Sequence, residues 1–339
     1  MTRAGDRDPA LPGRAGQRDA WETAATRREL DAAGITDPRL QDAYGRCRML
    51  NARHGRTYFL ATRLLPPARR PAVHALYGFA RHTDDLVDEP APEHGPEQIA
   101  ALLDGVAAAL DAGLRTRRSD HPVLAAVVDT AGRFGIAGAL FTAFLGSMRM
   151  DLTVAGYPTR AALRDYMYGS AEVIGLQLLP VLGTVCDPAE AAPYARALGR
   201  AFQLTNFLRD VGEDLDRGRV YLPADELAAY DVDRELLGWC RRTGRVEPRV
   251  RRALADQIAR TRAIYRLARP GIALLDPASR PCITTAYALY SRILDRIEDR
   301  GHNVFAGRVT IGSGRRLALA GTALGRTLWS RAVVHGRKD

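Results

Sequence analysis

Two acidic clusters stand out in the sequence because of the spacing of their side chains. The first contains Asp84, Asp85 and Asp88, and its outer members are four residues apart. On a helix, residues with this separation lie one turn above each other, so Asp84 and Asp88 would present carboxylates on one face. The like charges would repel each other unless a cation lay between them.

The second cluster extends the same spacing over a longer segment. Asn206, Asp210 and Asp214 recur every four residues, which predicts a row of oxygen ligands along one helical face. Residues between them, such as Phe207 and Val211, are apolar and would pack the helix into the core. We therefore expect the row to face a confined space.

Carboxylate and amide oxygens suit a hard divalent cation. Mg²⁺ takes oxygen ligands and is commonly shared between one or two carboxylates and the phosphates of a substrate. One Asp-x-x-x-Asp motif is usually a solvated helix face. Here there are two, beside Arg81 and Arg209 and inside apolar helices. This pattern favours a site that holds a diphosphate through Mg²⁺ or Mn²⁺.

The segments that carry these clusters are predicted to be helices. Apolar residues recur at three- and four-residue spacing over most of the chain, with Pro and Gly between the segments. No internal repeat or long linker is evident, so we expect one all-α domain. A candidate strand remains at 309–311. The expected helices are 39–53, 69–88, 97–112, 122–133, 137–151, 160–184, 189–214, 248–275 and 279–299.

Composition narrows the class of protein. The 339 residues are 46% hydrophobic and 26% charged, as in ordinary globular proteins. The four cysteines form no CxxC pair, which indicates reduced thiols in a cytoplasmic protein. No apolar stretch reaches the roughly 20 residues that a bilayer-spanning helix needs. The net charge of +10 would attract anions, but no nucleic-acid-binding motif accompanies it, so no nucleic-acid partner is expected.

Further segments accompany the two clusters at 54–58, 64–66, 148–151, 166–175, 218–223, 290–295 and 308–309. Together with 77–88 and 203–214, they make the sequence similar to the phytoene/squalene synthase family. The resemblance implies a single antiparallel helix bundle of the isoprenoid synthase type. It also implies a deep central cavity, with the two aspartate motifs facing each other at its mouth.

The resemblance also implies a role for each site residue. Phosphate oxygens would be held by arginines and by a hydroxyl: Arg81, Arg209, Arg308 and Thr57. The Mg²⁺ or Mn²⁺ ligands would be Asp84, Asp88, Asn206, Asp210 and Asp214, with Asn206 also in the substrate site. The reaction chamber would be lined by Tyr77, Tyr166, Gln203 and Tyr290.

The implied reaction joins two geranylgeranyl diphosphates head to head through a cyclopropyl diphosphate to give phytoene, without NADPH. The small Thr62, one turn from Tyr58, favours this long substrate over a shorter one. The alternative within the family is a squalene or dehydrosqualene synthase that uses farnesyl diphosphate. A different kind of alternative is an inactive relative that serves as a binding or assembly module, although both aspartate motifs are intact.

We expect the chain to have three parts. A loose leader and first helix are expected at 1–37, the helical isoprenoid synthase domain at 38–312, and a basic amphipathic segment at 313–339. That last segment would either rest on an anionic membrane surface or pack on the bundle.

The predicted helix at 160–184 contains unusual residues. Gly169, Gly175 and Gly183 predict either a kink beside the substrate or tight helix packing. Glu172 stands where the family usually has a small residue. Its side chain would either be buried and need a partner or face outward, and no role is assigned to it.

Overall fold

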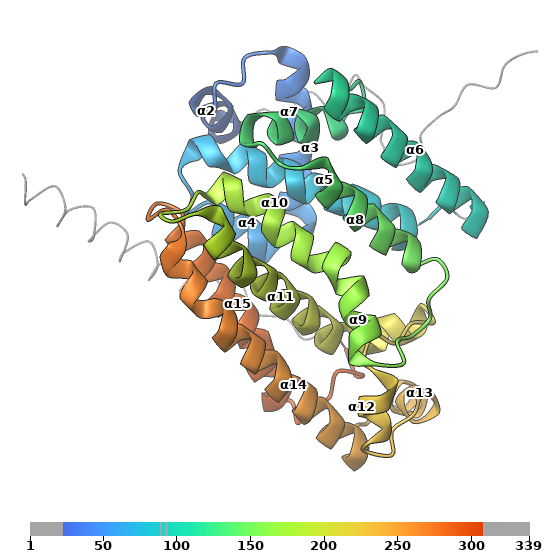
Figure 1. Ribbon diagram of the computed structural model, residues 1–339. Helices are drawn as coiled ribbons and strands as arrows, with labels where there is room; N and C mark the ends of the chain where they lie inside the picture. The colour runs from blue at the N-terminus through green and yellow to red at the C-terminus, as the bar shows by residue number, and fades with distance from the viewer. Residues whose placement is uncertain (1–22, 89, 92–93, 308–339) are drawn as a thin grey trace, which may run out of the picture.

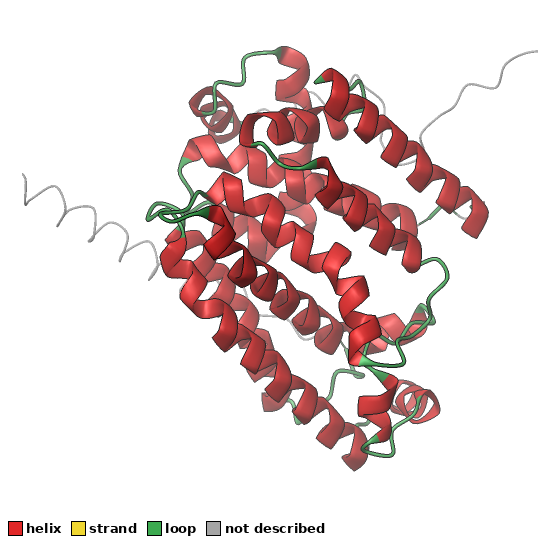
Figure 2. Cartoon of the chain, viewed as in Figure 1, coloured by secondary structure: helices red, strands yellow, loops and turns green. Residues whose placement is uncertain are grey.

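The computed structural model describes residues 23–88, 90–91 and 94–307. In this part of the chain the structure is built from helices joined by short loops (Figure 2). The α-helices shown in Figure 1 are α2 (Ala24–Ala32), α3 (Pro38–His54), α4 (Arg56–Thr62), α5 (Arg70–Asp88), α6 (Pro96–Thr116), α7 (Leu124–Phe134), α8 (Gly138–Met150), α9 (Arg160–Met167), α10 (Val173–Leu182), α11 (Pro188–Asp216), α12 (Ala224–Ala228), α13 (Arg234–Thr243), α14 (Pro248–Ala268) and α15 (Arg280–Asp299).

The helices form a bundle with α11 at its centre. Helix α11 packs against α10, α14 and α15, while α5 packs against α3, α7 and α10 (Figure 1). Among the described residues, the only β-type pairings are two isolated bridges, Gly156–Val220 and Thr184–Leu275. The predicted all-α bundle is therefore confirmed.

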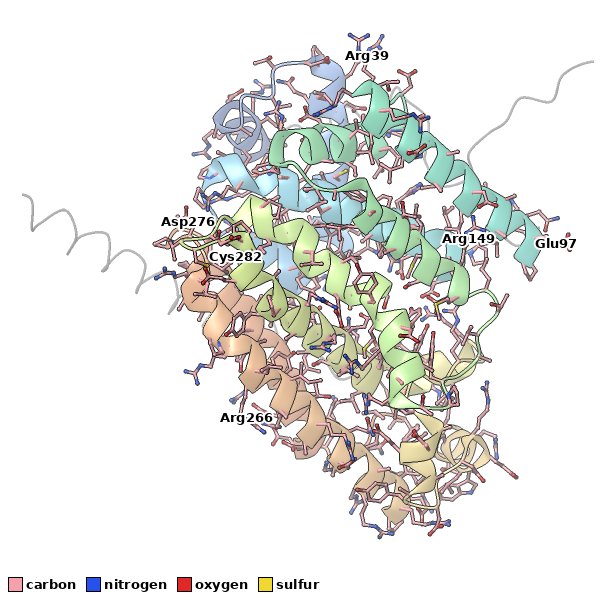
Figure 3. The ribbon with its side chains drawn as sticks, viewed as in Figure 1. Arg39, Glu97, Arg149, Arg266, Asp276 and Cys282 are labelled. Atoms are coloured by element: carbon pink, nitrogen blue, oxygen red, sulfur yellow. The ribbon has the colours of Figure 1, made fainter. Side chains whose placement is uncertain are left out.

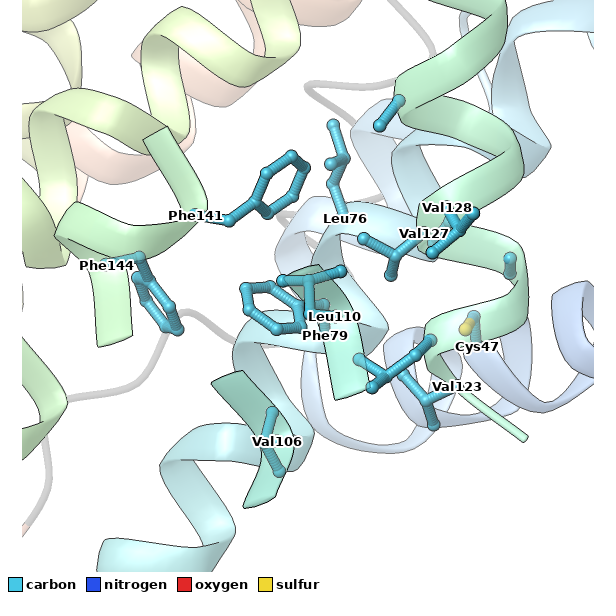
Figure 4. Packing of buried hydrophobic residues seen from close by; sticks show 14 of the residues in the cluster. Cys47, Leu76, Phe79, Val106, Leu110, Val123, Val127, Val128, Phe141 and Phe144 are labelled. Carbon is cyan, nitrogen blue, oxygen red and sulfur yellow. The ribbon is translucent and has the colours of Figure 1, made fainter. Parts of the chain in front are cut away.

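Two large apolar clusters hold the bundle together. The first joins α3, α5, α6, α7 and α8 (Figure 4). At its centre the Phe79 ring lies 5.5 Å from that of Phe141 and 5.4 Å from that of Phe144, between ring centroids. Such aromatic pairs add about 0.5–1.5 kcal/mol beyond their buried area. The second cluster joins α11, α13, α14 and α15, so each half of the bundle is a packed wall.

Helices α5 and α11 each bury one face and turn acidic residues away from it. In α5, Leu76, Phe79 and Val87 are buried, whereas Asp84 and Asp88 are only partly covered. Helix α11 begins where the Asp187 side chain accepts the N–H of Ala189 at 2.9 Å, which caps its first turn. Its buried side chains include those between the acidic positions, as predicted: Leu204, Phe207, Leu208 and Val211.

The helix predicted at 160–184 is broken. It consists of α9, a π-helical turn at Tyr168–Glu172, and α10. A Cβ at Gly169 would lie 2.1 Å from the Ala143 carbonyl oxygen of α8, and one at Gly175 would lie 2.4 Å from that of Ala195. Tight helix packing therefore explains these two glycines. Gly175 also lines a cavity, so close packing brings the backbone to that space.

Of the two alternatives for Glu172, the structure shows the buried side chain with partners. Its side chain is 4% exposed and lies between Arg196, at 2.6 Å, and Arg200, at 3.3 Å. A buried carboxylate is tolerated only with such partners. Both arginines are on α11, so the charge cluster joins the π-helical turn to the central helix.

Other helices differ from the predicted ones at their ends. The helix predicted at 248–275 ends at Ala268 and continues as a 3₁₀ turn at Arg269–Leu274, because Pro270 lacks the N–H that an α-helix requires. Helices α12 and α13 were not predicted from the sequence. Signals for α13 are present in Asp233, which caps the Leu236 N–H, and in Gly244, whose φ of 68° ends the helix.

Several sequence predictions fall outside the described residues. These are most of the leader, the candidate strand at 309–311, Arg308 and the segment at 313–339. The proposed division of the chain at 38 and 312 remains a prediction. None of the helices in the described ranges combines the length and apolar character needed to cross a membrane.

Candidate active site

Two cavities meet in the middle of the bundle. A polar one of about 610 Å³, which we call the reaction chamber, is lined by residues of α4, α5, α8, α9, α10, α11 and α15. An apolar one of about 270 Å³ lies beside it. Residues that line both spaces mark where they join: Tyr58, Tyr77, Ala80, Ser170, Ile174 and Gln203.

The structure brings most of the predicted site residues together around the chamber. Asp88, Asp210 and Asp214 are not among the lining residues but belong to the same faces of α5 and α11. Arg308 lies outside the described residues. The predicted residues that line the chamber are Thr57, Tyr77, Arg81, Asp84, Tyr166, Gln203, Asn206, Arg209 and Tyr290.

Arginines bind the carboxylates of the first aspartate motif. Arg81 donates to Asp84 at 3.2 Å and also pairs with the neighbouring Asp85, which lies one helical turn from Arg81. Asp88 accepts a hydrogen bond of 2.6 Å from Arg219 and lies 3.6 Å from Arg217. Both of these arginines follow the second motif in sequence, so they connect the two motifs across the site.

Side chains of the second motif form hydrogen bonds with one another. Arg209 donates twice to Asp210, at 2.8 and 2.5 Å, in the bidentate geometry that strengthens guanidinium–carboxylate pairs. Asn206 donates to Gln203 at 3.4 Å. The Oδ1 atom of Asn206 is buried and has no hydrogen-bond partner among the residues that the structure describes, although Asn206 lines the chamber. A buried oxygen of this kind is costly unless something binds it.

The two motifs face each other closely enough for their charges to interact. Burial raises the pKa of Asp84 to about 7, and the charge of Asp88 adds to the shift. Burial likewise raises the pKa of Asp214 to about 8, with contributions from Asp210 and Asp88. Crowded, poorly solvated carboxylates disfavour their charged forms. A cation placed among them would reverse that preference.

The donor set fits a divalent ion that the substrate helps to bind. Among the described residues, no three His, Cys, Asp or Glu side chains form a metal site by themselves. This agrees with the pairing of Asp84, Asp88 and Asp210 to arginines. The unpartnered Asn206 oxygen and the crowded carboxylates are hard ligands of the type Mg²⁺ accepts.

An aromatic collar lies where the chamber and the apolar cavity join. It consists of Tyr58, Phe202 and Tyr290. The centroid of the Tyr58 ring lies 4.9 Å from that of Tyr290, and the centroid of the Phe202 ring lies 4.6 Å from that of Tyr290. Ring faces in a dry site stabilise cations by up to about 2 kcal/mol.

The apolar cavity extends from the collar toward the other end of the bundle. Thr62 is buried in its wall and donates its hydroxyl to the Tyr58 carbonyl oxygen at 2.8 Å, so it adds no free polar group. Cys282 lines the same cavity, close to the loop that carries Asp276 (Figure 3). Arg69 fixes this loop by donating to Asp276 at 2.8 Å and to the Leu182 carbonyl oxygen at 2.7 Å.

Asp151 and Arg219 also belong to the site, although the spacing of the acidic residues does not indicate them. Asp151 ends α8 and accepts the hydroxyls of Tyr166, at 2.7 Å, and Tyr221, at 2.8 Å. Arg219 binds Asp88, as described above. Both residues belong to segments that contributed to the family resemblance, 148–151 and 218–223, which was a signal for them. Their partners, however, depend on how distant segments meet.

Residues 51–315 match the squalene/phytoene synthase family. The chain belongs to this family. Curated relatives include a phytoene synthase of Arthrospira platensis, 37% identical over 297 residues that cover 81% of this chain and 90% of the relative. A chloroplastic phytoene synthase of Narcissus pseudonarcissus is 38% identical over 294 residues, 85% of this chain and 67% of that one.

Solved structures of the family share the fold. A dehydrosqualene synthase in complex with a ligand superimposes with a TM-score of 0.75 at 25% identity, covering 85% of this chain and 97% of that one. A squalene synthase of Alicyclobacillus acidocaldarius gives a TM-score of 0.70 at 26% identity, with coverage of 80% and 99%. The predicted family and the isoprenoid synthase fold are thus confirmed, and the chain is a prenyltransferase.

Proposed function

We propose that this squalene/phytoene synthase family member condenses two geranylgeranyl diphosphates head to head to form phytoene. The observation that carries the proposal is the direct junction of the chamber, where both aspartate motifs meet, with the apolar cavity. Diphosphates would lie against the motifs while isoprenoid chains enter the cavity. The similarity to phytoene synthases over most of the chain supports this substrate.

The arginines would bind and orient the diphosphates. Arg81 and Arg209 line the chamber and are held by neighbouring carboxylates, from which they could turn to phosphate oxygens. Their planar forks match phosphate geometry and stay charged. Thr57, on the short helix α4, adds a hydroxyl to the same wall.

The residues that would hold Mg²⁺ or Mn²⁺ are Asp84, Asp88, Asn206, Asp210 and Asp214. When bound, the metal would supply Lewis-acid stabilisation of the leaving diphosphate. The protein groups do the rest: the aromatic collar would face the allylic cation, and the apolar walls would exclude water from it. The second substrate's double bond would then attack the cation, and loss of a proton as the three-membered ring closes would give the cyclopropyl diphosphate. This intermediate would ionise by losing its diphosphate, rearrange and lose a second proton.

A squalene or dehydrosqualene synthase is the second candidate, because solved structures of both kinds share the fold. Their identity to this chain is 25–26%, against 37–38% for the phytoene synthases. The small Thr62 in the cavity wall also leaves room for the longer chain. We therefore favour the twenty-carbon substrate, without NADPH.

Competition between substrates tests the proposal. Purified protein is incubated with equal concentrations of farnesyl and geranylgeranyl diphosphate and Mg²⁺, with and without NADPH, and the hydrocarbons are identified by mass spectrometry. We expect forty-carbon phytoene in both conditions. Predominant thirty-carbon product would overturn the substrate assignment, and the absence of any hydrocarbon would support an inactive binding module.

A further inference from the structure

Asp151 occupies an unusual position beside the reaction chamber. Its two carboxylate oxygens accept two tyrosine hydroxyls, Tyr166 to Oδ2 at 2.7 Å and Tyr221 to Oδ1 at 2.8 Å. Of these two tyrosines, Tyr166 lines the chamber. The carboxylate thus determines where the hydroxyl proton of a chamber residue points.

Backbone contacts hold this group in place. The Val220 N–H donates to the Ala155 carbonyl oxygen at 2.9 Å, and the Ala224 N–H donates to that of Tyr157 at 2.9 Å. The loop after α8 is thereby joined to the segment after α11 on both sides of Tyr221. Asp151 and Tyr221 are consequently held together although 70 residues separate them.

Aromatic rings support the Tyr166 side chain. Its centroid lies 5.3 Å from that of Tyr157, 5.5 Å from that of Tyr221 and 6.3 Å from that of Phe207. Tyr166 is 2% exposed. The ring therefore has little freedom, and its hydrogen bond to Asp151 fixes the remaining rotation of the hydroxyl.

The other chamber tyrosines are placed differently. The Tyr290 hydroxyl oxygen interacts with the Tyr58 hydroxyl and the Arg209 guanidinium, and the arginine can only donate to it. Tyr77 experiences the charges of Arg81 and Asp84, groups that the proposed function assigns to diphosphate and metal binding. Tyr166 differs from both because its proton is already directed to a carboxylate.

We propose that Asp151 is a positioning residue that prepares Tyr166 as the proton acceptor of the final step. The inference rests on the proposed function. The Tyr166 oxygen takes a proton from carbon of the last cationic intermediate while its own hydroxyl proton moves to Asp151 Oδ2. The C–H bonding pair becomes the new carbon–carbon double bond, so charge and atoms balance.

The charge state of Asp151 supports this assignment. Burial raises the pKa of Asp151 to about 6, although the hydrogen bonds from the two tyrosines and the charge of Arg219 act to lower it. At neutral pH it is therefore a carboxylate that can still take up a proton. A carbocation is a strong acid, so a phenol with such a partner is a sufficient base.

Single-turnover reactions with geranylgeranyl diphosphate test the inference by measuring the cyclopropyl intermediate and the final hydrocarbon separately. We expect Asp151→Asn and Tyr166→Phe each to lower the rate of hydrocarbon formation about 100-fold, in the range of general acid–base catalysis. The intermediate should accumulate in both, because the inference assigns to Tyr166 the proton lost in the final step and not the proton lost when the cyclopropane ring closes. The double variant should be no slower than Tyr166→Phe, because the two residues act as one unit.

Tyr157→Phe is the matched control. Its ring packs in the same cluster, but its buried hydroxyl has no hydrogen-bond partner in the described part of the chain. Removing the hydroxyl should therefore leave both rates unchanged. Melting curves check the fold of each variant. Should Asp151→Asn not fold, Asp151→Glu carries the test, because it keeps the charge but shifts the carboxylate, and it should also accumulate intermediate.

Wild-type partition between intermediate and hydrocarbon in a folded Asp151 variant would overturn the inference, as would additive losses in the double variant. A wild-type enzyme that makes thirty-carbon product from farnesyl diphosphate would instead overturn the proposed substrate. The same variants would then be compared with farnesyl diphosphate, so the two failures can be told apart.

Discussion

At the residue scale, the site combines carboxylates and arginines that neutralise each other. Arg81 binds Asp84, Arg209 binds Asp210, and Arg219 binds Asp88. These pairs keep buried charges tolerable without substrate. A diphosphate with its metal ions would give both kinds of side chain a new partner. The arginines would bind phosphate, and the carboxylates would bind metal. Binding of substrate and metal should therefore be coupled.

Removing the carboxylate of Asp84 or of Asp210 should abolish turnover. We expect Asp84→Ala and Asp210→Ala to lower kcat by several orders of magnitude, because metal-bound charge stabilisation is lost. Asp111→Ala is the control, since Asp111 pairs with Arg115 on the outside of α6. Circular dichroism should show helix content unchanged in all three. Near wild-type kcat in either site variant would refute the role of that residue.

Thr62 should control chain length from the wall of the apolar cavity. Thr62→Phe places a ring where Thr62 is buried, and overfilling costs about 1–3 kcal/mol, or roughly 5- to 150-fold in affinity. The loss in kcat/KM should be larger for geranylgeranyl than for farnesyl diphosphate. Thr62→Ser, which keeps the hydroxyl, should change the ratio little. Equal losses for both substrates would mean that this wall does not measure chain length.

At the element scale, helix α2 is fixed by a buried charge cluster. Glu29 lies 2.9 Å from Arg48, 3.1 Å from Arg70 and 3.7 Å from His74. Burial alone would raise the pKa of Glu29, but these partners outweigh it and lower the pKa to about 2. A carboxyl whose pKa is lowered on folding stabilises the protein above its unfolded pKa, about 4.5.

The Glu29 contribution should vanish in acid. A shift from 4.5 to about 2 corresponds to about 3 kcal/mol at neutral pH, which Glu29→Gln should remove. The difference in unfolding free energy from wild type, measured in urea, should shrink as pH falls from 4.5 toward 2. Asp120→Asn, on a fully exposed side chain, is the control. A difference that grew in acid would contradict this assignment.

The close contact at the π-helical turn should be intolerant of one added methyl group. Gly169→Ala would place a Cβ 2.1 Å from the Ala143 carbonyl oxygen, and we expect a loss of about 1–3 kcal/mol in unfolding free energy. Gly146→Ala is the matched change in α8, where no atom lies within 4 Å. It should be neutral or stabilising, because alanine favours helix. Stability unchanged by Gly169→Ala would show that the turn can relax.

The sequence predicted elements well where one face is apolar over many residues. Helices α5 and α11 show this, and their acidic faces meet as expected. It did not predict the π-helical turn or the inward Glu172, because both depend on how closely α8 and α11 approach Tyr168–Glu172. The short α12 and α13 lack a long period. For α13 the Asp233 cap and Gly244 were available signals, whereas α12 has no side-chain cap.

At the scale of the whole molecule, the two apolar clusters act as walls and the cavities lie between them. The position of the site residues could be predicted from sequence through the spacing of the acidic residues and the family resemblance. The Asp151–Tyr221 contact could not, because it joins loops 70 residues apart. Such contacts depend on how the bundle packs, and no local sequence pattern indicates them.

The most direct test of the account is the dependence of hydrocarbon formation on a divalent metal. Purified wild-type protein is supplied with geranylgeranyl diphosphate alone, first with EDTA and then with excess Mg²⁺ or Mn²⁺, in the absence of NADPH. We predict no product with chelator and phytoene, identified by its mass, once metal is restored. Full turnover in EDTA would contradict the assignment of both aspartate motifs. A metal-restored reaction that releases diphosphate without forming a forty-carbon hydrocarbon would instead contradict the proposed condensation of two geranylgeranyl diphosphates.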